Sequence, residues 1–297
     1  MEGEGRPGVL VPIGCASGIL SASAACFAGG IAALVAWRLS GDSVWVEQFF
    51  RIPGSFMMVL LASIQVWLSI WAARQFSPGE EMHSAWNLIT MSAMCAAAAS
   101  VLVRWLSVPS ILNPVVRLSA TPEQWFREFR TAGHLLAGPV RFALLAAGLY
   151  VALRAYRRAG FLGRLRWPDV VVLAMFAAYL ARNVADIVAA HRHFEWVEVA
   201  RWPTDPLLML LLAEGMLLRR SVQRMGSGWV GRCWAAFSLG VFLTAAGDVG
   251  GWAEAYGYLP YPWSAVVWFV WLPAAVCFAV APAYQLEAIR FAAEERA

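Results

Sequence analysis

Long apolar runs, separated by short polar segments, repeat along nearly the whole chain. Most of them approach the ~20 apolar residues that a helix needs to cross ~30 Å of hydrocarbon. The pattern predicts eight membrane-spanning helices, at residues 13–37, 52–73, 84–106, 135–153, 169–190, 206–218, 229–250 and 263–284. The sixth run is the shortest and therefore the weakest of these predictions. The predicted fold class is all-α, a polytopic membrane helix bundle that forms one domain.

The two ends of the chain differ in composition from these runs. Residues 1–12 hold Glu2, Glu4 and a single arginine, so they lack the basic region with which a cleaved signal peptide begins. We therefore expect a cytoplasmic tail at 1–12, a membrane domain at 13–284 and a second cytoplasmic tail at 285–297. This second tail is amphipathic and is predicted to contact a membrane or cytoplasmic protein partner. The residues of that predicted contact are Leu286, Ile289, Arg290, Phe291 and Glu294.

Composition narrows the classes of protein that fit this pattern. Apolar residues make up 60% of the 297 residues and charged residues 14%, whereas soluble domains have roughly half and about a quarter. A soluble or disordered protein is therefore excluded. All 23 basic residues are arginine. Retinal or pyridoxal Schiff bases and P-loop nucleotide sites need a lysine, so the sequence excludes them as well.

The arginines are divided unequally between the two sets of loops that alternate along the chain. The larger set is Arg6, Arg74, Arg154, Arg157, Arg158, Arg164, Arg166, Arg219, Arg220, Arg224, Arg232, Arg290 and Arg296. The smaller set is Arg38, Arg51, Arg104, Arg117, Arg127, Arg130, Arg192 and Arg201. Cytoplasmic loops carry the excess of basic residues. The predicted localisation is a bacterial inner membrane, with several spans and both termini in the cytoplasm.

Ionisable and polar side chains gather near the predicted outer ends of the spans, below loops that are rich in aromatic residues. The candidate ligand-binding residues are Arg104, Arg141, Arg182, Asn183, Asp186, Asp205 and Asp248. Ionisable groups within a membrane are costly and usually face the bundle interior. Arginine presents a rigid fork that matches carboxylate or phosphate, which predicts a small anionic or zwitterionic ligand. The alternative is structural: Arg182 and Asp186 form an ion pair along one helix face, and the others snorkel or cap helix ends.

Glu214 is set apart from this group, because it falls in the inner half of the sixth run. Three interpretations stay open for it: a protonated core carboxyl, an acid in a proton relay, or an ion-pair partner of Arg219. Of these, the pairing with Arg219 and the neighbouring arginine cluster is favoured.

The sequence predicts no catalytic residue and no metal site, and it identifies no cofactor. The five cysteines are far apart without a C-x-x-C pair, which indicates free thiols that pack as small apolar groups. The four histidines fall at helix ends or in loops, so no pair of them faces across a span to hold haem. The His191-Arg192-His193 triplet lacks the spacing of a zinc motif.

Four segments in the second half of the chain carry a likeness to a known family. They are WPDVVVLAMFAAYL, WPTDPLLMLLLAEGMLLRR, FLTAAGDVGGW and PYPWSAVVWFVWLPAAVCFAVAPAYQ. In hydropathy rhythm and in the placed Asp residues, residues 167–287 resemble the eight-span membrane input modules of bacterial diguanylate cyclases and histidine kinases. The resemblance implies a sensory role. In that family the last span continues into a signalling helix and an output domain, whereas here LEAIRFAAEERA follows Gln285.

Together these observations favour a non-enzymatic membrane binding or sensory component, with an outward-facing Arg/Asp ligand site and no output domain of its own. Two alternatives stay open. The chain could be an accessory subunit of a larger energy-transducing or pigment complex, in which tryptophan-rich faces meet cofactors or neighbouring subunits. It could also be an enzyme or transporter for a lipid-like or quinone substrate, with Glu214 and Asp248 as acid and base.

Overall fold

The architecture is helical throughout the part of the chain that can be described. The computed structural model describes residues 14–42, 44–49, 53–103, 131–189, 202–223, 228–255, 257–259 and 263–295, and these contain no strand. The helices are α1 (Cys15–Ser40), α2 (Val44–Phe49), α3 (Ser55–Arg74), α4 (Glu81–Val101), the π-helical η3 (Leu136–Val140), α7 (Arg141–Arg158), α8 (Trp167–Ala189), α10 (Thr204–Gln223), α11 (Trp229–Ala255) and α12 (Trp263–Glu294). The predicted all-α class is confirmed.

Seven of the described helices are long and apolar enough to cross a membrane: α1, α3, α4, η3 with α7, α8, α11 and α12. The remaining predicted span, the sixth, corresponds to α10, which extends the predicted run 206–218 at both ends to 20 residues. At 1.5 Å per residue α10 is about 30 Å long, which matches the hydrocarbon thickness. It is not among those seven because it includes the charged residues Asp205, Glu214, Arg219 and Arg220. A polytopic bundle of about eight helices is thus confirmed.

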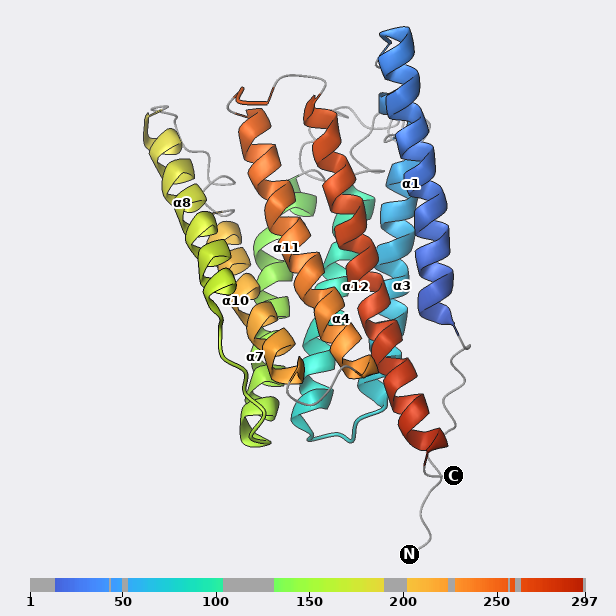
Figure 1. Ribbon diagram of the computed structural model, residues 1–297, viewed down its shortest axis with the longest axis vertical. Helices are drawn as coiled ribbons and strands as arrows, with labels where there is room; N and C mark the ends of the chain where they lie inside the picture. The colour runs from blue at the N-terminus through green and yellow to red at the C-terminus, as the bar shows by residue number, and fades with distance from the viewer. Residues whose placement is uncertain are drawn as a thin grey trace, which may run out of the picture.

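The helices run side by side in one bundle, and successive long helices point in opposite directions (Figure 1). The start of α1 and the end of α12 lie at the same end, where the Ala16 N–H donates to Glu287 Oε1 at 3.5 Å. We call this the arginine-rich end, because Arg74, Arg158 and Arg220 lie there. The other end is called the opposite end below.

An aromatic core holds α4, α7, α11 and α12 together. The side chains of Trp86, Trp234, Phe237 and Phe278 are at most 2% exposed, and neighbouring rings in this group have centroids 5.6 to 6.1 Å apart. Such spacings are those of favourable offset or edge-to-face aromatic pairs. The indole Nε1 of Trp234 donates to the Tyr156 hydroxyl at 2.9 Å, so this polar atom is satisfied inside the core.

A small residue also allows close packing between α11 and α12. Gly247 of α11 lies directly against the indole of Trp271 on α12, where a Cβ atom would overlap the ring. This is the packing expected of membrane helices, whose interfaces favour small residues because lipid tails offer no hydrophobic driving force between helices.

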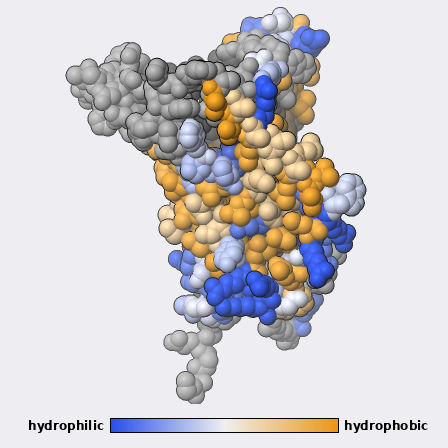
Figure 2. Space-filling model, turned by 90° about the vertical axis from the view of Figure 1, so that its left-hand side faces the viewer, coloured by the Kyte–Doolittle hydropathy of each residue, from blue (hydrophilic) through white to orange (hydrophobic). Residues whose placement is uncertain are grey.

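α8 lies at the edge of the bundle (Figure 1), and most of its surface is not covered by other helices. In its apolar part 11% of the residues are buried, against 61% in α12. Met175, Val184 and Val188 are each at least 60% exposed. Figure 2, which faces this side of the molecule, shows hydrophobic surface over the middle of the bundle and hydrophilic surface at the lower end. This distribution fits a helix whose outer face contacts lipid tails.

α12 runs without interruption through the predicted boundary between span and tail at residue 285. Leu286 is fully buried, so it is not available to a protein partner. Phe291 stacks on Trp229, with ring centroids 5.2 Å apart, and remains 44% exposed. Part of the apolar face predicted to meet a partner therefore packs on the chain itself.

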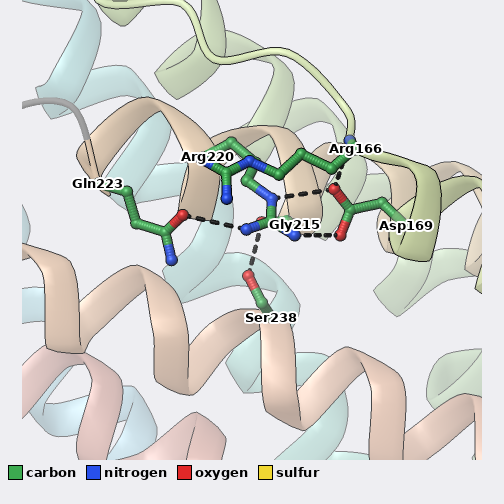
Figure 3. A network of polar contacts seen from close by, with 6 residues as sticks. All are labelled: Arg166, Asp169, Gly215, Arg220, Gln223 and Ser238. Atoms are coloured by element: carbon green, nitrogen blue, oxygen red, sulfur yellow. Dashed lines mark hydrogen bonds and ion pairs between the residues drawn. The ribbon is translucent and has the colours of Figure 1, made fainter.

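A buried ion pair fastens α8 to α10 at the arginine-rich end (Figure 3). Asp169 accepts from Arg220 Nε at 2.9 Å and from its terminal nitrogen at 2.8 Å, which is a bidentate pair. The backbone N–H of Arg166 donates to the same carboxylate at 2.8 Å. The two side chains are 11% and 16% exposed. Because α8 buries little apolar surface, this pair contributes much of what holds the start of the helix in place.

We expect Asp169→Asn to lower the free energy of unfolding by about 3 kcal/mol. The change leaves the guanidinium of Arg220 without its carboxylate in a mostly buried position, where breaking an ion pair is costly. Denaturant unfolding in detergent micelles measures the difference. Glu81→Gln is the control, because Glu81 pairs with Arg154 and Arg158, which are more than half exposed, and should cost less than about 1 kcal/mol. Equal effects of the two changes would contradict the role given to Asp169.

Candidate functional site

The candidate ligand-binding residues that the structure describes lie in the half of the bundle nearer the opposite end. Arg141, Arg182, Asn183, Asp205 and Asp248 come from α7, α8, α10 and α11. Arg104 and the side chain of Asp186, the two other candidates, lie outside the described residues. The ion pair between Arg182 and Asp186 therefore stays a prediction.

Arg141 places a permanent positive charge inside the bundle. Its guanidinium carbon lies 5.0 Å from the ring centroid of Phe278 on α12 and 5.6 Å from that of Phe142. Asp248 of α11 interacts with it electrostatically. No carboxylate oxygen of the described residues comes within 4.0 Å of the guanidinium. The charge is thus supported by an aromatic face and a more distant carboxylate, an arrangement that leaves its hydrogen-bonding fork available to an anion.

Arg141 directly follows an irregularity in its helix. The five residues of η3 are π-helical and include Pro139, which has no N–H to continue an α-helical pattern. Single π-turns of this kind often occur at functional sites. Gly138 in η3 lies against Thr204 at the start of α10, where a Cβ atom would come 2.7 Å from Thr204 Oγ1. This contact brings the segment that carries Arg141 next to Asp205.

Asp205 and Asn183 form the second part of the site. The amide Nδ2 of Asn183 on α8 donates to Asp205 Oδ2 on α10 at 2.9 Å, and both side chains are partly buried. A hydrogen bond to a carboxylate is stronger than one between neutral groups. The structure therefore brings together two candidate residues that lie on different predicted spans.

Arg182 and a group of aromatic rings form the third part, nearer the surface. Arg182 donates to the hydroxyl of Tyr258 at 2.7 Å, and its guanidinium lies 6.0 Å from the centroid of that ring. Trp252 connects Tyr258 to Tyr179 of α8, with ring centroids 5.2 and 5.6 Å away. Tyr258 and Trp252 belong to the aromatic residues of the predicted outer loops, so composition pointed to their location. The contact between Tyr258 and Arg182 could not be read from the sequence.

The favoured interpretation of Glu214, an ion pair with Arg219, is wrong. Glu214 is 5% exposed, and its Oε2 has no hydrogen-bond partner among the described residues. Residues five apart on an α-helix point about 140° away from each other, so Arg219 faces a different side of α10. The neighbouring Arg220 pairs with Asp169 instead. Glu214 is thus a buried carboxyl for which the described part of the chain offers no cationic partner, and the interpretations as a protonated core group or a relay acid both stay predictions.

The remaining reactive residues do not gather into a site in the part of the chain that is described. All five cysteines are free, and no three His, Cys, Asp or Glu residues are grouped closely enough there to hold a metal ion. His83 is hydrogen-bonded through Nδ1 to the carbonyl oxygen of Ala73 at 3.0 Å. This bond connects the ends of α3 and α4, which is a structural role.

Comparison with known proteins identifies no family for this chain. The chain matches no model of a protein family, no curated protein and no solved structure. Function is therefore inferred from the side chains described above.

We expect Glu214→Leu to stabilise the protein by about 1 to 3 kcal/mol, measured by unfolding in detergent micelles. A buried polar atom without a partner costs about that much, and leucine removes the polar group at similar volume. Glu214→Ala serves as the control, because it removes the same carboxyl but leaves a cavity and should not stabilise. A marked loss of stability in Glu214→Leu would show that the carboxyl has a stabilising partner after all.

Proposed function

We propose that this protein is a non-enzymatic binding or sensory component of a bacterial inner membrane, which holds a small anionic or zwitterionic ligand near the opposite end of the bundle. Under this proposal the arginine-rich end and both termini face the cytoplasm, in keeping with the excess of basic residues there. The opposite end then faces the periplasm, from which the ligand would enter.

One observation carries the proposal: the guanidinium of Arg141 lies within the bundle, without a carboxylate of the described residues inside 4.0 Å. A charge in this environment needs a counter-charge or hydrogen-bond acceptors, since an isolated one is costly away from water. A bound carboxylate or phosphate would supply both. Asp248 near the same guanidinium disfavours ligands with high negative charge and favours those that also carry a cationic group.

The contacts of α8 offer a route from ligand binding to a response. At the opposite end α8 is held by polar bonds from Asn183 to Asp205 and from Arg182 to Tyr258. At the arginine-rich end it is held by Asp169 and Arg220. A ligand that competes for Arg182 or Asn183 would release one end of this sparsely packed helix while the other stays fixed. This fits the resemblance to the membrane input modules of diguanylate cyclases and histidine kinases.

A thermal-shift screen of the purified protein tests the binding site. The panel contains inorganic phosphate, succinate, glutamate and glycine betaine, and the readout is the unfolding temperature in detergent. We expect at least one of them to raise the Tm, because a ligand at 100 times its Kd stabilises by about 2.7 kcal/mol. Arg141→Gln should abolish that shift, because it removes the charge that recognises the anion.

Arg38→Gln is the matched control, since Arg38 is an exposed arginine in the last turn of α1, away from the candidate site. This variant should keep the shift of the unmodified protein. The proposal fails if none of the four compounds raises the Tm, or if Arg141→Gln responds as strongly as Arg38→Gln.

A further inference from the structure

A second concentration of charge lies at the arginine-rich end, independent of the candidate ligand site. Around the ends of α7 and α10 and the start of α8, the ion pairs with carboxylates use Arg154, Arg158 and Arg220. Four further arginines of this region have no carboxylate oxygen of the described residues within 4.0 Å, and all are exposed. We call them the basic patch: Arg157, Arg164, Arg166 and Arg219.

The segment between α7 and α8 is fixed in place, so the arginines of the patch are held near one another. The backbone N–H of Gly163 donates to Ser221 Oγ on α10 at 2.8 Å. Gly163 lies so close to α10 that a Cβ atom would be 2.5 Å from the Ser221 nitrogen and 2.6 Å from the Arg220 carbonyl carbon. This contact sets Arg164 beside the end of α10, which carries Arg219.

Arg166 is positioned by the same network. Its backbone N–H and the Arg220 side chain bond to one carboxylate, that of Asp169, and its own side chain extends toward Arg220 (Figure 3). The guanidinium of Arg220 and the backbone of Arg166 thus share a single carboxylate. The network leaves a net positive charge that no described side chain compensates.

Exposed apolar side chains lie in the same chain segment as the basic patch. Trp167 is 78% exposed, and Phe161 and Leu162 in the same segment are 41% and 37% exposed. Trp167 is the first residue of α8, so arginines and apolar side chains lie together in the chain segment where that membrane helix begins. In Figure 2 hydrophilic surface at the lower end lies directly below the hydrophobic surface of the bundle.

We propose that the basic patch binds the headgroup of an anionic phospholipid, with the acyl chains of that lipid along the start of α8. The guanidinium groups match the phosphate oxygens in charge and geometry. Trp167, Phe161 and Leu162 match the boundary between headgroup and acyl chain, where aromatic residues are favoured. Free phosphate or a nucleic acid would use the charges but leave these apolar side chains in water. This proposal does not depend on the ligand site near Arg141.

Titration of the detergent-solubilised protein with phosphatidylglycerol or phosphatidylcholine of identical acyl chains tests the proposal. The readout is the lipid concentration that gives half of the maximal rise in Tm. We expect phosphatidylglycerol to act at much lower concentration than phosphatidylcholine. Inorganic phosphate at the same concentration should have no effect in Arg141→Gln, in which the candidate ligand site has lost its anion-binding charge. In the Arg164→Gln/Arg166→Gln double variant we expect the half-maximal concentration of phosphatidylglycerol to rise about 25-fold. Each basic residue near an anionic surface contributes about 1 kcal/mol, which is about fivefold.

Arg74→Gln is the matched control, because Arg74 is an exposed arginine at the same end but on α3. Its response should equal that of the unmodified protein. If the double variant does not fold, Arg157→Gln replaces it, with an expected change of about fivefold. Equal responses to the two lipids, an equal loss in Arg74→Gln, or a full effect of inorganic phosphate in Arg141→Gln would each overturn the proposal.

Discussion

The permanent charge of arginine is the constraint on which much of this structure depends. A guanidinium keeps its proton under all ordinary conditions, so each one in or near the membrane must reach water, a carboxylate, an aromatic face or a bound anion. Arg220 meets Asp169 in a bidentate pair, Arg182 meets Tyr258, and Arg141 lies over Phe278. These three contacts connect α8 with α10, α8 with the segment that follows α11, and α7 with α12.

Between its two polar ends, the bundle is held together by close side-chain packing rather than by ion pairs. The buried rings of Trp86, Trp234, Phe237 and Phe278 fill the space between α4, α11 and α12, and small residues such as Gly247 let the helices approach closely. Lipid tails are as apolar as this core, so tight packing supplies the stability here. Since α8 takes little part in that packing, it depends on polar contacts at its two ends.

The difference in packing gives α8 a distinct place in both proposals. Its end near Asn183 and Arg182 belongs to the candidate ligand site, and its start near Asp169 adjoins the basic patch. A helix with strong end contacts and weak side contacts can change its tilt at a low cost in buried area. α8 is therefore a sparsely packed helix that connects the candidate ligand site with the basic patch.

The amino-acid sequence by itself determined the fold class and the region of the candidate site. Apolar runs of membrane length need no tertiary information to be recognised, because a span satisfies its backbone hydrogen bonds internally. Likewise, the cost of charge in a membrane identifies Arg141, Asn183 and Asp205 as unusual. The partners of these residues were decided by tertiary structure alone, since contacts between helices depend on rotation and register. Thus Asn183 reaches Asp205 across two helices, and Arg220 rather than Arg219 finds a carboxylate, while Glu214 has no cationic partner among the described residues.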